Sequence, residues 1–590
     1  KTLTVIDQSV RRINSTLKEK EEKLNIDNLS LKDQKTFELL QRGETTAIFQ
    51  LESKGMRDYL KQLIPNDFED IVSMNALYRP GALGMNMVDS YINRKHGKEE
   101  VTYGHESVKK ILGTTYGVIV YQEQVMQIAQ ELSGFSLGQA DILRRAMGKK
   151  KKEEMESLRS TFVDGAVKKD VNERYAANLF DQIEQFAGYG FNRSHSVGYA
   201  LIAYQTAWLK AHYPAEFMAS VLSCDLGNTD NIQLFVDDCK NIGLTVLSPD
   251  INHSSYKFEN PNNKTILYGL GAIKGIGESL VDKIISEREV EKFKDMYDFC
   301  LRVGFKRINR RILTTLIGSG AMDALGKRKD LFARIDSCLK NAEQASERDK
   351  SNIRDLFGEE IITPEINEID EEVEFDEVSA EWSALGFYLD SHPLENKKKE
   401  VRNMCGFFIS ELQSETHNQR ISGCLIQFNV RSGRRGRFAF ATLDDGSGKI
   451  EVSIWADAFE KYRNLLKKGQ VLVVEGMVEK DAYSDSQRHK MIAERILTFD
   501  QARREFVKNI KIDIEDSAHT EDIVGSLKEI ANSDDGNLVL ISYKGNTAKA
   551  DIVLPKNFSV NLDDSSIKAL DKRFGAENVE FVYHSQIHIN

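Results

Sequence analysis

The chain has 590 residues, of which 41% are hydrophobic and 29% charged, a composition typical of a soluble globular protein. At roughly 150 residues per domain, this length predicts about four domains. No run approaches the roughly 18 apolar residues of a membrane-spanning helix, and no signal-peptide pattern opens the chain. The six cysteines form no CxxC pair, which disfavours a disulfide framework or a zinc site. We therefore expect a reducing, cytoplasmic location.

The net charge is −11, from 80 Lys and Arg against 91 Asp and Glu. Eleven of the acids lie between Glu359 and Glu381, a stretch that contains no Lys or Arg. The remainder is balanced and carries clustered basic segments. Because nucleic acids respond to local rather than global charge, the overall negative charge does not exclude such a partner.

Residues 29–219 are predicted to be mostly helical, with 3.6-residue periodicity over Val118–Leu132 and Glu173–Phe186. Further helices are expected over residues 222–338. Residues 344–376 are polar and then strongly acidic, which is the composition of a linker.

The pattern changes to alternating strands over residues 421–497. Five short strands are expected there, with a helix at Ala458–Leu466 before the fourth. This arrangement is typical of a small barrel of the oligonucleotide/oligosaccharide-binding (OB) type. The tail, Phe506–Asn590, alternates strands with helices and predicts a small α/β or α+β module.

The common catalytic motifs are absent: the sequence contains neither GxxxxGK[ST] nor a GxSxG elbow. Paired acids occur at Asp237-Asp238 and Asp444-Asp445, and clustered acids can hold Mg²⁺. Adjacent acids on a helix point about 100° apart, however, and Asp-Asp-Gly is ordinary turn chemistry. Structural roles are expected for both pairs, and the sequence shows no complete catalytic site.

Two segments of the helical half combine groups that bind phosphates and bases. Leu143–Lys152 carries six cations in ten residues, which suits either a polyphosphate or a solvated helix end. The loop Gly188–Ser196 brings aromatic, Asn, Arg, Ser and His residues together, and such groups stack on bases and meet phosphates. Tyr204 and Trp208, four residues apart, are expected to pack in the core.

Two glycine-centred hairpins follow. Tyr268–Gly277, leading into Glu278–Arg288, has the pattern of a helix-hairpin-helix motif, in which glycines let backbone N–H groups approach a phosphate. Leu316–Ala321 resembles a degenerate second copy, and a purely structural hairpin is the alternative. The predicted fold is therefore multidomain: a mainly α region with a helix-hairpin-helix module, an OB-type β-barrel and a small α/β C-terminal module.

A short apolar peptide, Ile353–Gly358, lies within the polar segment. Leu356 and Phe357 cannot serve a local core there, and together they suit the hydrophobic groove of a partner. Leu-Phe pairs are common, so alone this signal is weak.

Taken in order, these segments resemble the C-terminal half of the bacterial DNA polymerase III alpha subunit, a family C DNA polymerase. The resemblance covers essentially the whole chain. Its most specific residues are Thr46–Ser53, Tyr78–Gly81, Tyr121–Met126, Arg144–Lys150, Gly188–Ser196 and Leu209–Pro214.

The resemblance implies five regions. They are polymerase fingers at 1–220, beginning with a stub of the palm edge; a tandem helix-hairpin-helix, DNA- and clamp-binding domain at 221–345; a clamp-binding peptide with an acidic linker at 346–410; an OB-fold at 411–500; and a domain resembling the tau-binding tail at 501–590.

It also implies site residues. Those expected to face the incoming nucleotide are Arg144, Arg145 and Lys149 at the triphosphate, with Tyr189 and His195 lining the pocket. Those expected to grip duplex DNA are Lys274, Gly275 and Gly277, and those expected to meet single-stranded template are Arg431, Arg434, Arg435 and Arg437. The clamp-binding peptide comprises Ile353, Asp355, Leu356 and Phe357, although the family's peptide usually opens with Gln.

In this family, primer extension from dNTPs on a DNA template is a nucleotidyl transfer that uses two Mg²⁺ held by three palm aspartates. The resemblance places those aspartates, and the PHP domain, before Lys1. The chain alone is therefore expected to hold no metal and to extend no primer. The implied partners are primer–template DNA, dNTPs, the beta sliding clamp, the clamp-loader tau subunit and, through the N-terminal domain, a proofreading exonuclease; no membrane is expected.

Two alternatives stay open: a non-catalytic protein that binds DNA and tethers a clamp, and an error-prone paralogue of the alpha subunit. The acidic stretch adds a physical hypothesis. Its eleven carboxylates are expected to keep Glu359–Glu381 extended and away from DNA, which would leave the clamp peptide accessible.

Overall fold

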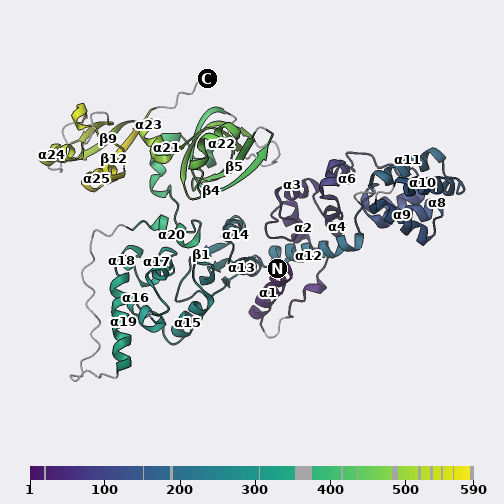
Figure 1. The fold of residues 1–590 in the computed structure, drawn as a ribbon, viewed down its shortest axis with the longest axis horizontal. Coiled ribbons are helices and arrows are strands. Elements are labelled where there is room, and N and C mark those ends of the chain that lie inside the picture. Colours follow the sequence, from purple (N-terminus) through teal and green to yellow (C-terminus); the bar gives the residue numbers. More distant parts are fainter. Residues whose placement is uncertain are drawn as a thin grey trace. The chain divides into compact units, whose positions relative to one another are not determined.

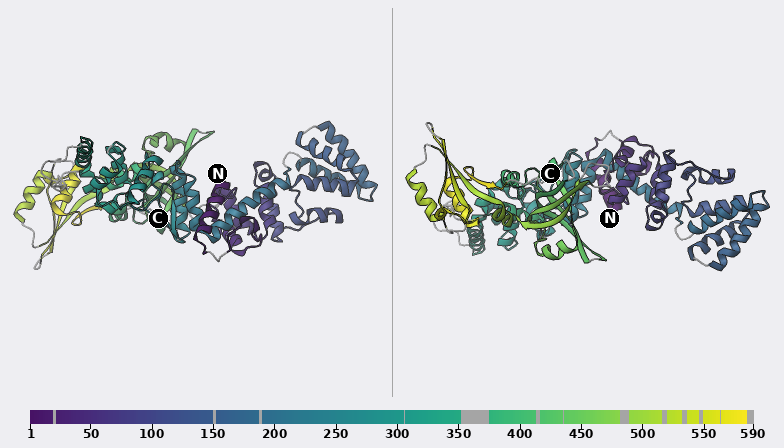
Figure 2. Two further views of the ribbon diagram at one scale, coloured as in Figure 1. Left: turned by 90° about the horizontal axis from the view of Figure 1, so that it is seen from below. Right: turned by 90° about the horizontal axis from the view of Figure 1, so that it is seen from above.

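The computed structural model divides the chain into two compact units, residues 1–293 and 294–590, which are described in turn (Figures 1 and 2). The residues it describes are 1–18, 22–149, 152–186, 190–304, 306–351, 375–412, 416–434, 436–480, 489–515, 520–531, 536–545, 549–562 and 564–584.

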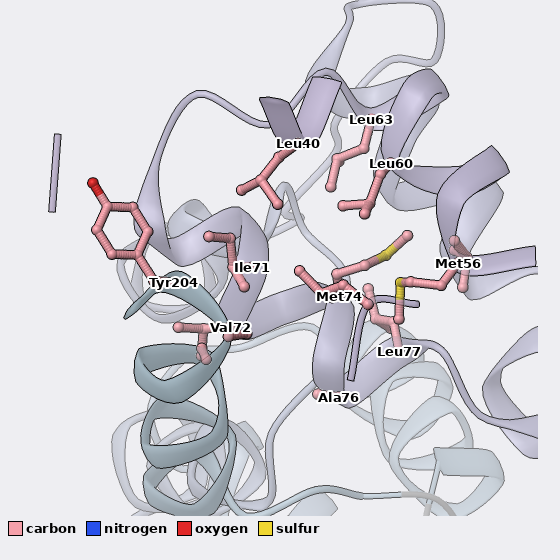
Figure 3. Close-up of a cluster of buried hydrophobic side chains, with 14 of the residues drawn as sticks. Leu40, Met56, Leu60, Leu63, Ile71, Val72, Met74, Ala76, Leu77 and Tyr204 are labelled. Carbon is pink, nitrogen blue, oxygen red and sulfur yellow. The ribbon is translucent and has the colours of Figure 1, made fainter. Parts of the chain in front are cut away.

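The first unit contains two helical clusters, each with its own core. The first cluster consists of α2 (Gln34–Gln41), α3 (Lys54–Leu63), α4 (Phe68–Leu77), α5 (Pro80–Gly84), α6 (Met87–Lys95) and the long α12 (Arg193–His212). α12 packs against α2 and α4. Figure 3 shows Tyr204 of α12 beside Ile71 and Val72 of α4. Tyr204 is fully buried, which confirms its predicted place in the core.

The second cluster consists of α7 (Glu106–Leu112), α8 (Gln122–Ser133), α9 (Leu137–Lys149), α10 (Lys152–Val167) and α11 (Glu173–Phe186). Helix α11 has the predicted bounds. The predicted helix Val118–Leu132 begins four residues late, because Val118–Tyr121 is extended and Tyr121 forms a β-bridge with Phe191. That bridge attaches the start of α8 to the residues just before α12.

The remainder of the first unit consists of α1 (Thr2–Thr16), α13 (Pro214–Ser223), α14 (Thr229–Asn241), α15 (Glu278–Arg288) and the strands β1 (Thr245–Leu247), β2 (Glu259–Asn262) and β3 (Thr265–Leu267). The strands form a sheet in the order β1-β3-β2. The helices expected over residues 222–338 are present, but the sequence analysis did not predict this small sheet among them. Each of these strands is only three or four residues long, too short for an alternating pattern to be recognised.

The second unit begins with helices α16 (Met296–Val303), α17 (Arg310–Gly318), α18 (Arg328–Ala333), α19 (Ile335–Ser351), α20 (Glu377–Leu385) and α21 (Lys398–Cys405). The first residues of the predicted linker, up to Ser351, belong to the helix α19, and its last residue, Asp376, lies directly before α20. Asp376 caps α20 by accepting from Val378 N and Ser379 N. The expectation of an extended segment is therefore wrong for Glu377–Glu381, which lie in α20.

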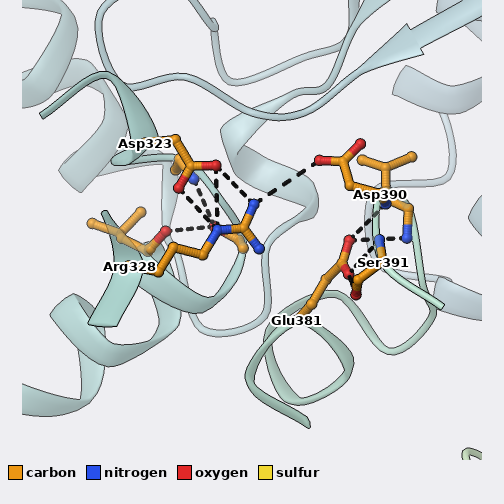
Figure 4. Close-up of polar contacts among 9 residues, drawn as sticks. Asp323, Arg328, Glu381, Asp390 and Ser391 are labelled. Atoms are coloured by element: carbon orange, nitrogen blue, oxygen red, sulfur yellow. Dashed lines mark hydrogen bonds and ion pairs between the residues drawn. The ribbon is translucent and has the colours of Figure 1, made fainter. Parts of the chain in front are cut away.

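Glu381 shows why. Its carboxylate is buried and accepts hydrogen bonds from the backbone of Leu389 at 3.0 Å and Asp390 at 2.9 Å. It also accepts from the backbone and the hydroxyl of Ser391 (Figure 4). A carboxylate that satisfies this many donors stabilises a folded loop, so composition alone misassigned this residue to a solvated run.

The five-stranded barrel follows, as predicted. It is closed in the order β4-β5-β6-β8-β7 and consists of β4 (Thr416–Gly433), β5 (Gly436–Asp444), β6 (Lys449–Ile454), β7 (Val471–Lys480) and β8 (His489–Thr498). Helix α22 (Ala456–Tyr462) and a 3₁₀ turn at Arg463–Leu465 lie before the fourth strand, at the predicted insert. Inward-facing aliphatic residues such as Ile421, Val452 and Val474 fill its core.

The last module is a four-stranded sheet with helices, consistent with the predicted α/β or α+β character. Its elements are α23 (Phe499–Phe506), β9 (Val507–Glu515), α24 (Thr520–Ile530), β10 (Leu538–Lys544), β11 (Lys549–Val553), α25 (Asp564–Phe574) and β12 (Val579–Tyr583). The strand order is β11-β10-β9-β12, with β10 parallel to β9.

Both acidic pairs have structural roles, as expected. Asp238 pairs with the buried ammonium of Lys210 at 2.7 Å. Asp445 accepts from Ile409 N and, within its turn, from Gly448 N. All six cysteines are free thiols. Among the described helices, none is both long and apolar enough to cross a membrane.

The Lys210–Asp238 pair gives a test of the first unit's core. Lys210 also donates to the carbonyls of Glu44 and Thr46, each at 2.9 Å, and its burial lowers the pKa of its ammonium. Asp238→Ala leaves this buried charge without its counter-ion and is expected to lower the free energy of unfolding by about 3–5 kcal/mol. Urea denaturation measures this. Asp7→Ala, which removes an exposed ion pair with Arg11 on α1, is the control, and an equal loss in both would contradict the assignment.

Candidate nucleic-acid interface

An aromatic row lies along the start of α12. Phe191 precedes the helix, and His195 and Tyr199 follow at four-residue intervals on the same face. The ring centroids of Phe191 and His195 are 5.5 Å apart, and those of His195 and Tyr199 are 4.2 Å apart. Phe49 continues the row at 5.3 Å from Tyr199, and the Arg79 guanidinium lies 3.5 Å from the Phe191 centroid at its other end.

This row is accessible. His195 and Arg79 are exposed, and Tyr199 keeps 36% of its surface. Partial burial against Phe191 lowers the pKa of the Arg79 guanidinium. Phe191 and Phe49 are half-buried, so His195 and Tyr199 are the rings that can stack on bases, next to a cation that can attract phosphates.

The row is held by contacts between α8 and the start of α12. Asn192 caps α12 through His195 N at 2.8 Å, and its side-chain amide donates to Glu123 at 2.7 Å. Glu123 also accepts from the backbone of Arg193, whose guanidinium pairs with Glu69 at 2.7 Å. These bonds fix the loop at the junction of the two helical clusters.

Arg144 and Arg145 lie on α9, in the second cluster. Both bind the same carboxylate: Asp141 lies 2.8 Å from Arg144 and 2.6 Å from Arg145. The hydrogen bond from Arg144 lowers the pKa of Asp141. Arg145 is 66% exposed, so an incoming phosphate could replace this partner. Arg144 and Arg145 pair with Asp141, whereas His195 packs against Phe191 and Tyr199, so among the described residues these two groups are not in direct contact.

The predicted helix-hairpin-helix turn has an open face. Gly275 adopts φ +78°, and a Cβ at either Gly275 or Gly277 would meet no atom within 4 Å. Lys274 is exposed beside them, and partial desolvation lowers its pKa. Gly277 is the N-cap of α15, whose first backbone N–H groups favour an anion. The element before the turn is a single 3₁₀ turn, Leu270–Ala272, rather than a full helix.

The degenerate second hairpin has no comparable open face. A Cβ at Gly318 would lie 2.8 Å from the carbonyl oxygen of Ala380, so this glycine permits α17 and α20 to pack closely. Gly320, at φ +82°, lies under the guanidinium of Arg328, which pairs with Asp323 (Figure 4). This hairpin therefore has a structural role.

The β4–β5 hairpin of the barrel carries an aromatic platform. Phe438 lies 5.6 Å from Phe440 and 5.5 Å from Trp455, measured between ring centroids. Trp455 is 49% exposed. Arg431 lies 5.5 Å from the Phe440 ring, and Arg437 is exposed two residues from the hairpin turn. Arg434 is exposed in that turn.

Several predicted site residues cannot be placed. Tyr189, Arg435 and the clamp peptide Ile353, Asp355, Leu356 and Phe357 lie outside the described residues. Lys149 is the last residue of α9, and nothing is described of its side chain. Within the described residues, no group of three or more His, Cys, Asp and Glu side chains is arranged to hold a metal ion.

The structure adds residues that sequence reasoning did not single out as site residues. They are Arg79, Phe49 and Tyr199 beside His195, and Phe438, Phe440 and Trp455 on the barrel. A signal existed for the barrel: Phe438 and Phe440 alternate with Ala439 and Ala441, so one face of the strand is aromatic. No local signal joins Phe49 to Tyr199, because 149 residues separate them.

A mainly helical region, a glycine hairpin with an open face and a barrel with an aromatic platform together define a class of proteins that bind nucleic acids. Family models identify the same parts. Residues 2–170 match the bacterial DNA polymerase III alpha subunit finger domain. Residues 243–331 match the helix-hairpin-helix motif, and residues 421–498 match the OB-fold nucleic acid binding domain.

Individual relatives extend this match to 99% of the chain. It is 40% identical to DNA polymerase III subunit alpha of Escherichia coli strain K12 over 607 residues, and 40% identical to that of Vibrio cholerae over 602 residues. The subunit of Pasteurella multocida is 41% identical over 609 residues. The chain spans about half the length of these relatives, 52% in each case. The predicted resemblance to DNA polymerase III alpha subunits is confirmed.

The Asp141 contacts yield a testable prediction. Asp141→Asn removes the carboxylate that holds Arg144 and Arg145 and keeps the side chain's size. Affinity for inorganic tripolyphosphate is expected to rise by up to about fivefold, because an exposed ion pair is weak and its release changes anion binding only modestly. Isothermal titration measures this. Asp7→Asn frees Arg11 from a similarly exposed pair on α1 and serves as control; an equal gain in both would refute a specific role for Asp141.

Proposed function

We propose that this chain supplies the nucleotide- and DNA-handling parts of a bacterial replicative DNA polymerase that extends a primer from dNTPs on a DNA template. The observation that carries the proposal is the 40% identity over 99% of the chain, which includes the loop that builds the α12 aromatic row. That row and the α9 arginines provide the base-stacking and phosphate-binding groups that such a reaction needs.

In this proposal the fingers bind the incoming nucleotide. Arg144, Arg145 and Lys149 meet its triphosphate, and His195 and Tyr189 line its pocket. The exposed arginines support this role, since guanidinium groups bind phosphates in a bidentate manner. Positioning and charge neutralisation are what phosphoryl transfer requires from a protein. In a full-length family member, palm aspartates would hold the Mg²⁺ that this reaction uses.

The two DNA contacts have different chemistry. The hairpin of Lys274, Gly275 and Gly277 offers backbone N–H groups and one ammonium, which suits the phosphates of duplex DNA. The barrel offers stacked rings flanked by arginines, which suits unpaired bases of the template strand. Arg435 completes the proposed basic loop.

The remaining partners are proposals from the resemblance. The beta sliding clamp would bind the peptide that contains Leu356 and Phe357, and the clamp-loader tau subunit would bind the last module. A proofreading exonuclease would bind the N-terminal domain of the full-length family member. A cytoplasmic location follows from the same proposal.

The difference between the two DNA contacts can be tested with the 590-residue chain. Trp455→Ala is expected to weaken binding of a single-stranded oligonucleotide by roughly five- to 150-fold, since stacking contributes about 1–3 kcal/mol per base. Duplex binding should hardly change, and Trp455→Phe should retain most of the affinity. Fluorescence anisotropy measures both.

Lys274→Ala is the reciprocal variant. It should weaken duplex binding and reduce the slope of log affinity against log salt by about 1, while leaving single-strand binding intact. If each variant affected both DNA forms equally, the separate assignments would fail.

The nucleotide role is tested in a full-length subunit. Arg144→Ala is expected to raise the KM for dNTPs at least tenfold, because a charge-assisted phosphate contact is worth about 1.5–3 kcal/mol. Arg159→Ala is a matched control. Arg159 lies on α10 in the same helical cluster and pairs with Asp181 on α11. Steady-state primer extension measures both. An unchanged KM in Arg144→Ala would favour the non-catalytic clamp-tethering alternative.

A further inference from the structure

A cavity of about 480 Å³ opens in the second unit, where α20, the loop before β7 and the start of α23 meet. Its volume lies within the range of small-ligand sites. Three kinds of group line it: the aromatic rings of Trp382, Tyr388 and Phe499, the lysines Lys397, Lys467 and Lys468, and polar groups on Ser379, Ser383, Gln470 and Thr498. None of these residues belongs to the barrel platform or to either glycine hairpin.

The aromatic wall is fixed before any ligand arrives. The rings of Trp382 and Tyr388 are 4.8 Å apart, with an angle of 40° between their planes. Gly469, at φ +82°, lets the indole lie close against the backbone, since a Cβ there would be 2.8 Å from Trp382. A side chain at this position would therefore displace the indole.

Glu381 holds the two ends of this wall together. It precedes Trp382 on α20 and accepts hydrogen bonds from the backbone of Leu389 and Asp390, directly after Tyr388. Figure 4 shows the carboxylate pointing at this loop. The buried Glu381 contacts thus fix the loop that carries Tyr388 to the helix that carries Trp382, so little ordering is needed on binding.

The cavity is cationic. Three lysines are among the described residues that line it, against one acid, Asp500, which pairs with Arg503 at 3.7 Å. Lys467 and Lys468 are exposed at one side, and the Lys397 ammonium lies 5.0 Å from the Phe499 centroid. In a chain of net charge −11, this local excess of positive charge favours an anion.

We propose that this cavity binds a nucleoside phosphate, with the base against Trp382 and Tyr388 and the phosphate at Lys467 and Lys468. Rings with adjacent ammonium groups recognise a base joined to a phosphate, because the base can stack on the rings while the phosphate meets the ammonium groups. A simple anion has no ring to stack on the aromatic wall. The same chemistry is presented by a free nucleotide and by one nucleotide of a single strand. The inference does not depend on the proposed polymerase function.

The test uses the 590-residue chain carrying Arg144→Ala, Arg145→Ala and Trp455→Ala, which weaken the nucleotide and single-strand sites proposed above, so that binding at the cavity is measured against a lower background. Two probes are titrated at low salt by anisotropy: the fluorescent nucleotide mant-dATP and a short fluorescein-labelled oligothymidylate. Lys467→Ala/Lys468→Ala and, separately, Trp382→Ala are then added. The double variant Lys109→Ala/Lys110→Ala, an exposed lysine pair on α7, is the matched charge control.

The Lys467/Lys468 and Trp382 variants should each weaken at least one probe by about tenfold, and the control pair should change neither by more than about twofold. Weaker mant-dATP binding identifies a free nucleotide, and weaker oligothymidylate binding alone identifies a strand. If neither probe responds to the Lys467/Lys468 variant, the proposal is overturned. That variant alters exposed side chains only, so it remains decisive even if Trp382→Ala, checked by circular dichroism, does not fold.

Discussion

Burial of polar groups along α12 is the constraint on which the first unit depends. This helix carries a phenol at Tyr204 and an ammonium at Lys210 into an apolar core, where an unpaired polar group costs several kcal/mol. Each therefore has partners from distant segments. The Tyr204 hydroxyl donates to Ser30 O and accepts from Asp33 N, and Lys210 bonds two carbonyls and Asp238.

These bonds also determine how rigid the first turns of α12 are. With its middle and end fixed, α12 presents its first two turns to solvent as a rigid support for His195 and Tyr199. The carboxylate of Glu123 then holds the first turn through the backbone of Arg193. Rigid secondary structure positions binding groups more accurately than a free loop does, so the buried contacts serve the exposed surface.

In the second unit, a β-barrel rather than a long helix supports the exposed aromatic groups. Its barrel places Phe438 and Phe440 on one face of a strand while Ala439 and Ala441 fill the interior, so stability and binding use alternate positions. Glu381 acts as an internal polar anchor for the α20 region, much as Asp238 does in the first unit. In both units a buried carboxylate fixes a helix that carries an aromatic side chain of a proposed site: Asp238 acts through Lys210 on α12, and Glu381 acts on α20.

Patterns among residues that are close in the sequence were enough to predict several helices, the barrel and the family resemblance. Periodicity predicted α11 to the residue, alternation with turn residues predicted the barrel and its helix before the fourth strand, and the motifs predicted the polymerase resemblance. Each of these signals is carried by neighbours in sequence. Only the tertiary structure decided which residues meet: Phe49 with Tyr199, Asp238 with Lys210, and Glu381 with the loop after Tyr388. Composition assigned Glu381 to a solvated acidic run, because the donors that make its burial favourable come from a loop whose position is set by folding.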